Sequence, residues 1–159
     1  MEIRFVPRGI VEIDNARLCF RNFEGRAGEY NDAGDRNFAI VIPNQQLADE
    51  LANEGWNVKV RPPRTPDDDP FMYLPVKVKF NERGPAVYLI SGRSRQRLNE
   101  NTVKCLDKID IMSVDLDIRP YDWEMRGSRG RTAYLQAIHV TQNTDRFAAR
   151  FADEEYPEE

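Results

Sequence analysis

The sequence holds few residues of the kinds that build metal centres or nucleophilic catalytic sites. Its 159 residues include two cysteines and one histidine. Cys19 and Cys105 lie far apart and match no zinc-ligand spacing, so we expect two reduced thiols. His139 has no serine or cysteine partner in a catalytic arrangement, and Walker A, HExxH and CxxC motifs are absent. We therefore predict a protein without enzyme activity, without a cofactor and without a metal.

Long apolar segments are also missing. The run from Phe38 to Ile42 is far shorter than the roughly 20 residues that cross a bilayer. Residues 1–5 contain two charged side chains and lack the apolar stretch of a signal peptide. We expect a cytoplasmic protein that does not associate with membranes.

The chain lacks the positive charge of many nucleic-acid-binding proteins, because its net charge is −4. The acids are unevenly distributed, however. Residues 152–159 contain five acids and no base, namely Asp153, Glu154, Glu155, Glu158 and Glu159. Without these five, 23 basic residues face 22 acidic ones. We predict one domain over residues 1–151 and a flexible, disordered acidic tail over residues 152–159.

Alternation of apolar and polar residues dominates the rest of the chain and predicts strands. The apolar phase shifts near Asp14 and Asn15, which indicates one long strand over residues 10–20 with a β-bulge. Residues 38–42 are typical of a central strand. Further strands are expected at residues 56–60, 74–80, 86–90, 112–123 and 131–142, the last two joined by a turn at 126–130.

One helix is predicted at residues 45–54, capped by Asn44 and ended by Gly55, and a short helical piece at 101–108. Residues 21–36 and the proline-rich residues 62–70 are expected to form loops. Many short strands with one or two short helices favour a mainly β fold. We predict an OB-fold-like small β-barrel.

Basic residues are interleaved with aromatic residues in several of these segments. Cations can follow the phosphates of a single strand, and flat rings can stack its bases without sequence preference. This pattern predicts a surface for single-stranded DNA. The candidate contact residues are Arg21, Phe23, Arg26, Lys59, Arg61, Tyr73, Lys77, Lys79, Tyr88, Arg93, Arg95, Tyr121, Trp123, Arg126, Arg129 and Arg131.

Other interpretations of these residues stay open. Phe23 could pack on the barrel instead of stacking a base, and Trp56 shares a strand face with Val58 and Val60, which favours the core. Asp115 and Asp117, alone or with Glu124, could instead hold a divalent metal for nuclease chemistry. A third alternative is a phage protein-interaction module that acts on a host factor through an acidic surface.

Several segments together resemble a family of tailed-phage and prophage single-stranded DNA-binding proteins of the T7 type. They span most of the chain and are Phe20-Arg21-Asn22-Phe23, Gly34-Asp35-Arg36-Asn37-Phe38, Gly55-Trp56-Asn57-Val58, Val114-Asp115-Leu116-Asp117-Ile118-Arg119-Pro120-Tyr121 with Trp123, Ala133-Tyr134-Leu135, and Asp145-Arg146-Phe147.

The resemblance implies an OB-fold, DNA binding without a cofactor, and an acidic tail that contacts replication or recombination proteins, such as a polymerase, helicase or recombinase. The expected setting is an infected or lysogenic bacterial host, and a homodimer is compatible with the sequence. The resemblance assigns no individual DNA contact, so the candidate residues rest on their chemistry alone.

Overall fold

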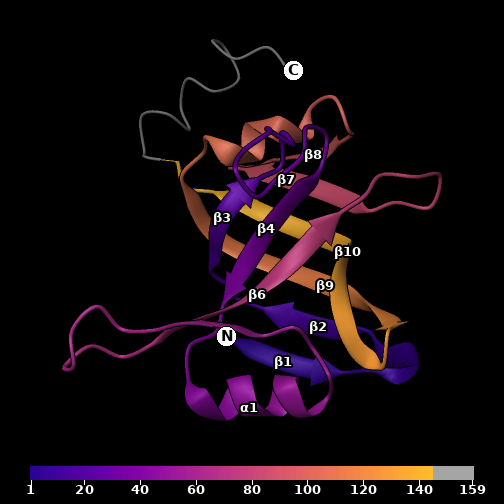
Figure 1. Ribbon diagram of the computed structural model, residues 1–159. Helices are drawn as coiled ribbons and strands as arrows, with labels where there is room; N and C mark the ends of the chain where they lie inside the picture. Colours follow the sequence, from indigo (N-terminus) through magenta and orange to yellow (C-terminus); the bar gives the residue numbers. More distant parts are fainter. Residues whose placement is uncertain (145–159) are drawn as a thin grey trace.

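Ten strands and one α-helix make up residues 1–144 of the computed structural model, which are the residues described here (Figure 1). Two short 3-10 segments, Pro7–Gly9 and Val103–Asp107 (η1 and η2), complete them. The acidic tail predicted at 152–159, and the segment Asp145-Arg146-Phe147, lie outside the described residues. No helix among residues 1–144 is long and apolar enough to cross a membrane.

The strands form one sheet with β9 and β10 at its centre. Along its main path the order is β1-β2-β9-β10-β6-β4-β3, while β5 pairs with β6, and β7 pairs with β10 and β8. The bounds are β1 Glu2–Phe5, β2 Val11–Asp14, β3 Leu18–Asn22, β4 Arg36–Val41, β5 Lys59–Arg61, β6 Phe71–Val78, β7 Ala86–Ser91, β8 Ser94–Leu98, β9 Ile111–Met125 and β10 Ser128–Gln142.

The mainly β class is confirmed, but the prediction of a closed barrel is wrong. Strands β1 and β3 end the main path of the sheet and do not pair with each other. A backbone bond of 2.8 Å from the Ala16 N–H to the Val114 carbonyl joins the β2–β3 connection to β9, but no ladder continues from it. The sheet is therefore strongly coiled yet open.

The single strand predicted at residues 10–20 is two strands. β2 pairs with β1 and β9 near one edge of the sheet, whereas β3 pairs with β4 at the other edge of its main path. Asn15 takes a φ of +55° at the break, and its N–H donates to the Asp115 carboxylate at 2.9 Å. The shift in apolar phase thus marks a change of partner strand.

The helix prediction is confirmed, since α1 spans Gln45–Asn53. The Asn44 side-chain oxygen accepts a bond from the Leu47 N–H at 2.8 Å, which is the expected N-cap. Ala48 and Leu51 bury the apolar face, and Gly55 ends the segment with a φ of +92°. α1 lies at one end of the molecule, with β7, β8 and η2 at the other (Figure 1).

The final pair of strands is longer than predicted. β9 and β10 pair from Ile111 with Gln142 to Met125 with Ser128, so the turn contains only Arg126 and Gly127. Both turn residues have positive φ, +52° and +83°, as a tight two-residue hairpin requires. Loops at residues 62–70 and the turn at Asn81–Gly84 match the prediction, and Phe38 and Ile40 are buried in β4 between β3 and β6.

Candidate nucleic-acid interface

The outer side chains of β5, β6, β9 and β10 lie on one continuous side of the sheet. Ala133 of β10 pairs with Val76 of β6, and both are fully buried. Because strand side chains alternate, the adjacent pair Tyr134 and Lys77 points to the outer side. Strand register adds the remaining members. We call this surface the stacking face, and it comprises Phe20, Lys59, Arg61, Phe71, Tyr73, Lys77, Arg119, Tyr121, Trp123 and Tyr134.

A cluster of three rings forms one end of the stacking face. Phe20 of β3 meets Tyr73 of β6 edge-on, with ring centroids 5.1 Å apart, and Phe71 at 6.0 Å. The Arg61 guanidinium lies over the Phe20 ring, 5.1 Å from its centroid. Lys59 is the register partner of Tyr73, so its amine borders the same rings. Apolar rings and cations thus occupy one small surface.

The β9–β10 hairpin carries the other end of the stacking face. Tyr121 and Tyr134 pack edge-on, with centroids 5.7 Å apart, and the Arg119 guanidinium lies 5.0 Å from the Tyr134 ring centroid. Tyr121 is 54% exposed and Trp123 is 40% exposed. Exposed rings of this size are costly in water unless they bind a ligand.

The Trp123 ring lies close to the backbone of its cross-strand partner, Gly130. A Cβ added at Gly130 would come within 2.6 Å of the Trp123 ring atom Cζ2 and within 2.9 Å of Cε2. Because Gly130 has no side chain, the strand leaves room for the Trp123 indole. This arrangement fixes the ring on the strand and leaves part of it open to solvent.

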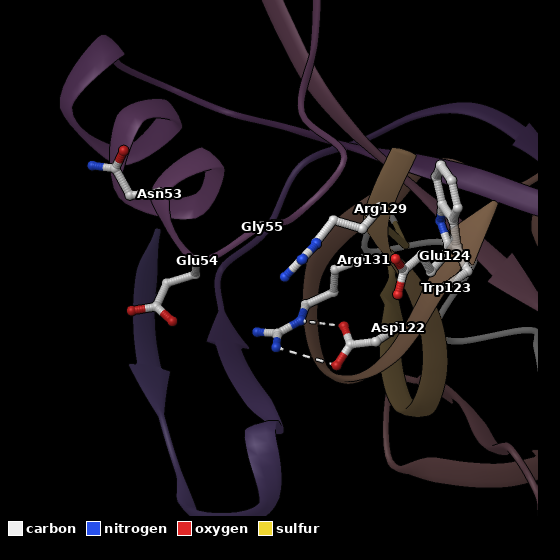
Figure 2. Close-up of a pocket in the computed structure, with 9 residues that line it drawn as sticks. Asn53, Glu54, Gly55, Asp122, Trp123, Glu124, Arg129 and Arg131 are labelled. Atoms are coloured by element: carbon white, nitrogen blue, oxygen red, sulfur yellow. Dashed lines mark hydrogen bonds and ion pairs between the residues drawn. The ribbon is translucent and has the colours of Figure 1, made fainter. Parts of the chain in front are cut away.

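Arg129 and Arg131, which we predicted beside these rings, lie on the opposite side of the hairpin (Figure 2). They line a hollow with Asp122, Glu124 and the end of α1. Arg131 donates from Nε to Asp122 Oδ1 at 2.7 Å and from Nη2 to Oδ2 at 3.3 Å. These bonds lower the pKa of Asp122 below its usual range.

The ion pair with Asp122 already neutralises Arg131. Its guanidinium also lies 5.5 Å from the centroid of the buried Trp56 ring, which confirms Trp56 as a core residue. Trp123 also lines this hollow, but Tyr121 does not, and the side chains of Arg129 and Arg131 project from the other side of the hairpin. The cause is strand alternation, which sends adjacent residues to opposite sides.

Tyr88, Arg95 and Arg97 form a separate cluster on β7 and β8. The Arg95 guanidinium lies 4.1 Å and that of Arg97 lies 5.9 Å from the Tyr88 ring centroid, and His139 meets the ring edge-on at 5.0 Å. His139 is the register partner of Asp115, so carboxylates adjoin this cluster. Three further candidates, Lys79, Arg93 and Arg126, are exposed beyond the end of β6 or in turns.

The prediction that Phe23 stacks a base is wrong. Phe23 is completely buried and stacks on Phe38, with centroids 5.0 Å apart and an interplanar angle of 22°. Burying this apolar ring in the core stabilises the fold more than leaving it exposed to water in a loop would. Arg21 also has a structural contact, because its Nη1 donates to the carbonyls of Leu106 and Ile109 at 2.7 and 2.9 Å.

Arg26 bonds within its own loop. Its Nη2 donates to the Arg21 carbonyl at 3.4 Å, and its Nε lies 3.7 Å from Glu24 Oε2. In contrast, Lys59, Arg61, Lys77 and Arg119 of the stacking face form no ion pair with any residue in 1–144. No carboxylate of residues 1–144 neutralises their charge, which is therefore available to a phosphate.

Acidic side chains gather on β2 and the first half of β9. Glu12 is the register partner of Asp117, and Asp14 and Asp115 line a small hollow beside it. Burial, followed by the charges of Glu12 and Asp14, raises the pKa of Asp117. The Asp115 carboxylate accepts the hydrogen bond from the Asn15 N–H and so has a structural contact.

Residues 1–144 do not group a third metal ligand with Asp115 and Asp117. Glu124 lies seven residues beyond Asp117 on the same strand, which is about 23 Å at the rise of a strand. Within residues 1–144, no three His, Cys, Asp or Glu side chains are grouped so that they could hold a metal ion.

Comparison with known proteins places the chain in a family. Residues 3–159 match the family described as "Putative phage ssDNA-binding domain". The chain belongs to this phage single-stranded DNA-binding family. The match covers almost all of the chain and confirms the resemblance found in the sequence. A search of curated protein sequences found no match.

Solved structures show the same fold as this family member. A C-terminally truncated single-stranded DNA-binding protein from bacteriophage Enc34 is 14% identical, with a TM-score of 0.57, over 89% of this chain and 90% of that chain. The Enc34 protein in complex with ssDNA is also 14% identical, with a TM-score of 0.58, over 90% of this chain and 92% of that chain. At this identity the likeness concerns the fold.

Four members of the stacking face were not among the predicted contact residues. Phe71 continues the alternation of Tyr73 and Lys77 on β6, so the sequence contained the signal for it. Arg119 alternates with Tyr121 in the same way. Tyr134 is out of phase with the predicted residues Arg129 and Arg131 of β10, and its pairing with Arg119 places it on the face. Phe20 is exposed because of a bulge in β3, and no local sequence pattern predicts that bulge.

Proposed function

We propose that this protein coats and protects single-stranded DNA during phage replication or recombination, with little sequence preference. Its membership of a phage ssDNA-binding family supports the nucleic acid. The observation that carries the site is the stacking face, where exposed rings alternate with cations that no carboxylate of residues 1–144 neutralises.

The rings and the cations would divide the task between them. Phe71, Tyr73, Tyr121 and Trp123 stack bases, because every base has an aromatic face and stacking is indifferent to sequence. Lys59, Lys77 and Arg119 contact phosphates along the same path. Asp115 and Asp117 lie on the same side of β9 as Arg119 but nearer the start of the strand, and their charge repels DNA and so limits the path to the half of β9 that carries the stacking face.

Residues 1–144 contain no element suited to reading a duplex. The helix α1 packs its buried residues, Ala48 and Leu51, against the core. The exposed rings lie on strands of the sheet and not on a helix that could enter a DNA groove. We place the open, coiled sheet among OB-like folds, with residues 1–151 as one DNA-binding domain. We propose that the protein has no enzyme activity and acts in the cytoplasm of the bacterial host.

The acidic residues 152–159 have a proposed role in the same function. Their five carboxylates carry the charge sign of a nucleic-acid strand, so they compete with DNA for the cations of the stacking face. When DNA occupies the face, the segment becomes available to a basic surface of a polymerase, helicase or recombinase.

The test is a pair of titrations with a labelled oligonucleotide, one single-stranded and one duplex, at several salt concentrations. We expect tighter binding of the single strand and a log–log salt slope of about −0.7 per phosphate neutralised. Equal affinity for the duplex, or binding that does not change with salt, would contradict the proposal.

A further inference from the structure

Phe20 has a backbone conformation that is unusual for a bulky residue. In the β3–β4 ladder, Cys19 pairs with Ala39 and Asn22 with Asn37, so two residues of β3 face one of β4. Phe20 lies in this bulge with a φ of +52°. Glycine is the residue that adopts such a conformation without strain, and a large side chain pays for it in conformational free energy.

The bulge turns the Phe20 ring toward solvent. Leu18, two residues earlier, packs on the core, and regular alternation would direct residue 20 to the same side. The ring is instead 48% exposed on the stacking face. The chain therefore gives up both an unstrained backbone and the burial of an apolar ring at this position.

The surroundings of the ring suit a nucleotide. Tyr73 and Phe71 support it edge-on from β6, and the Arg61 guanidinium lies over it at 5.1 Å. Neither Arg61 nor the neighbouring Lys59 forms an ion pair within the described chain. A ring that carries a displaceable cation, beside a second cation, provides one stacking position and two phosphate positions.

We propose that Phe20 stacks a base of single-stranded DNA and that Arg61 covers its ring until the DNA binds. On binding, the base takes the place of the guanidinium over the ring, and Arg61 moves to the adjacent phosphate. A charge-assisted contact with phosphate then replaces the contact between cation and ring. This inference rests on the proposed function and adds a stacking position at the β3 end of the face.

Substitutions at Phe20 and Arg61 test the exchange, with oligonucleotide affinity as the readout. Phe20→Ala should lower the affinity about five-fold or more and leave the salt slope unchanged, whereas Phe20→Tyr should keep the affinity. Arg61→Ala should reduce the magnitude of the salt slope by about 0.7. Phe5→Ala is the matched control, because Phe5 is 50% exposed on β1, outside the stacking face, and should not change binding.

A glycine variant separates function from folding. Glycine tolerates the φ of +52°, so Phe20→Gly should melt at a higher temperature than Phe20→Ala and bind DNA as weakly. If the wild type binds single-stranded DNA and both variants match its affinity, the inference is overturned while the proposed function stands. If the wild type itself does not bind, the proposed function fails and this inference fails with it.

Discussion

Replacing Gly130 with alanine should displace the Trp123 ring and weaken DNA binding. Gly130 has no positive φ, so alanine fits the backbone of β10 without strain. Its methyl group, however, would lie 2.6 Å from Cζ2 of the indole, closer than such atoms can approach. The ring must therefore leave its position against the strand.

The size of the effect follows from what the ring does. If Trp123 stacks one base, its loss removes about 1–3 kcal/mol of binding free energy, which is about five-fold to more than a hundred-fold in affinity. The stability cost should be small, because Trp123 is 40% exposed and lies in the part of the hairpin beyond the core. Most of the effect should therefore appear in binding.

The assay is fluorescence anisotropy with a labelled oligonucleotide, compared for wild type and for Gly130→Ala. Gly28→Ala is the matched control, because a Cβ at Gly28 meets no atom within 4 Å and its φ is not positive. A Gly130→Ala/Trp123→Ala double variant should bind no more weakly than Trp123→Ala alone. Wild-type affinity in Gly130→Ala would refute the reasoning that Trp123 stacks a base.

Three further predictions concern the core, the acidic cluster and the tail. Phe23→Ala should lower the free energy of unfolding by about 3–5 kcal/mol in urea melts, since the ring is fully buried; a loss of DNA affinity with unchanged stability would contradict this. Burial and neighbouring carboxylates raise the pKa of Asp117, so its ionisation opposes folding as the pH rises through that pKa. Asp117→Asn should therefore stabilise the protein at neutral pH, and the gain should vanish in acid below the unfolded pKa. Deleting residues 152–159 should tighten DNA binding, most at low salt, and an unchanged affinity at low salt would remove the proposed competition.

Local signals in the sequence predicted local structure well. The helix α1 was predictable because its cap at Asn44, its apolar face and its stop at Gly55 are all contained in one segment. Likewise, the prolines of residues 62–70 exclude a central strand whatever the rest of the chain does.

Non-local contacts account for the errors. The apolar phase at Asp14 and Asn15 was visible, but only the pairing of β2 with β9 and of β3 with β4 shows that the chain changes partners there. Phe23 is buried because Phe38, from the next strand, provides a surface for it. For the same reason an open sheet and a closed barrel cannot be distinguished by periodicity.

The candidate site was predictable in composition but not in arrangement. Interleaved cations and rings drew attention to β6 and the β9–β10 hairpin, which carry most of the stacking face. It was harder to predict which residues lie on the same side of the sheet, because that depends on the exact register of the strands. A shift of one residue in that register moves Arg131 from the Tyr121 side to the Asp122 side.

The most direct test of the stacking face is the emission of Trp123 during a DNA titration. Trp123 and the buried Trp56 are the two tryptophans of the chain, so a Trp56→Phe variant isolates the Trp123 signal. We predict that single-stranded oligonucleotide quenches this emission in a saturable way and that the same concentration of duplex does not. Saturable binding of single-stranded DNA with no change in Trp123 emission would contradict the account.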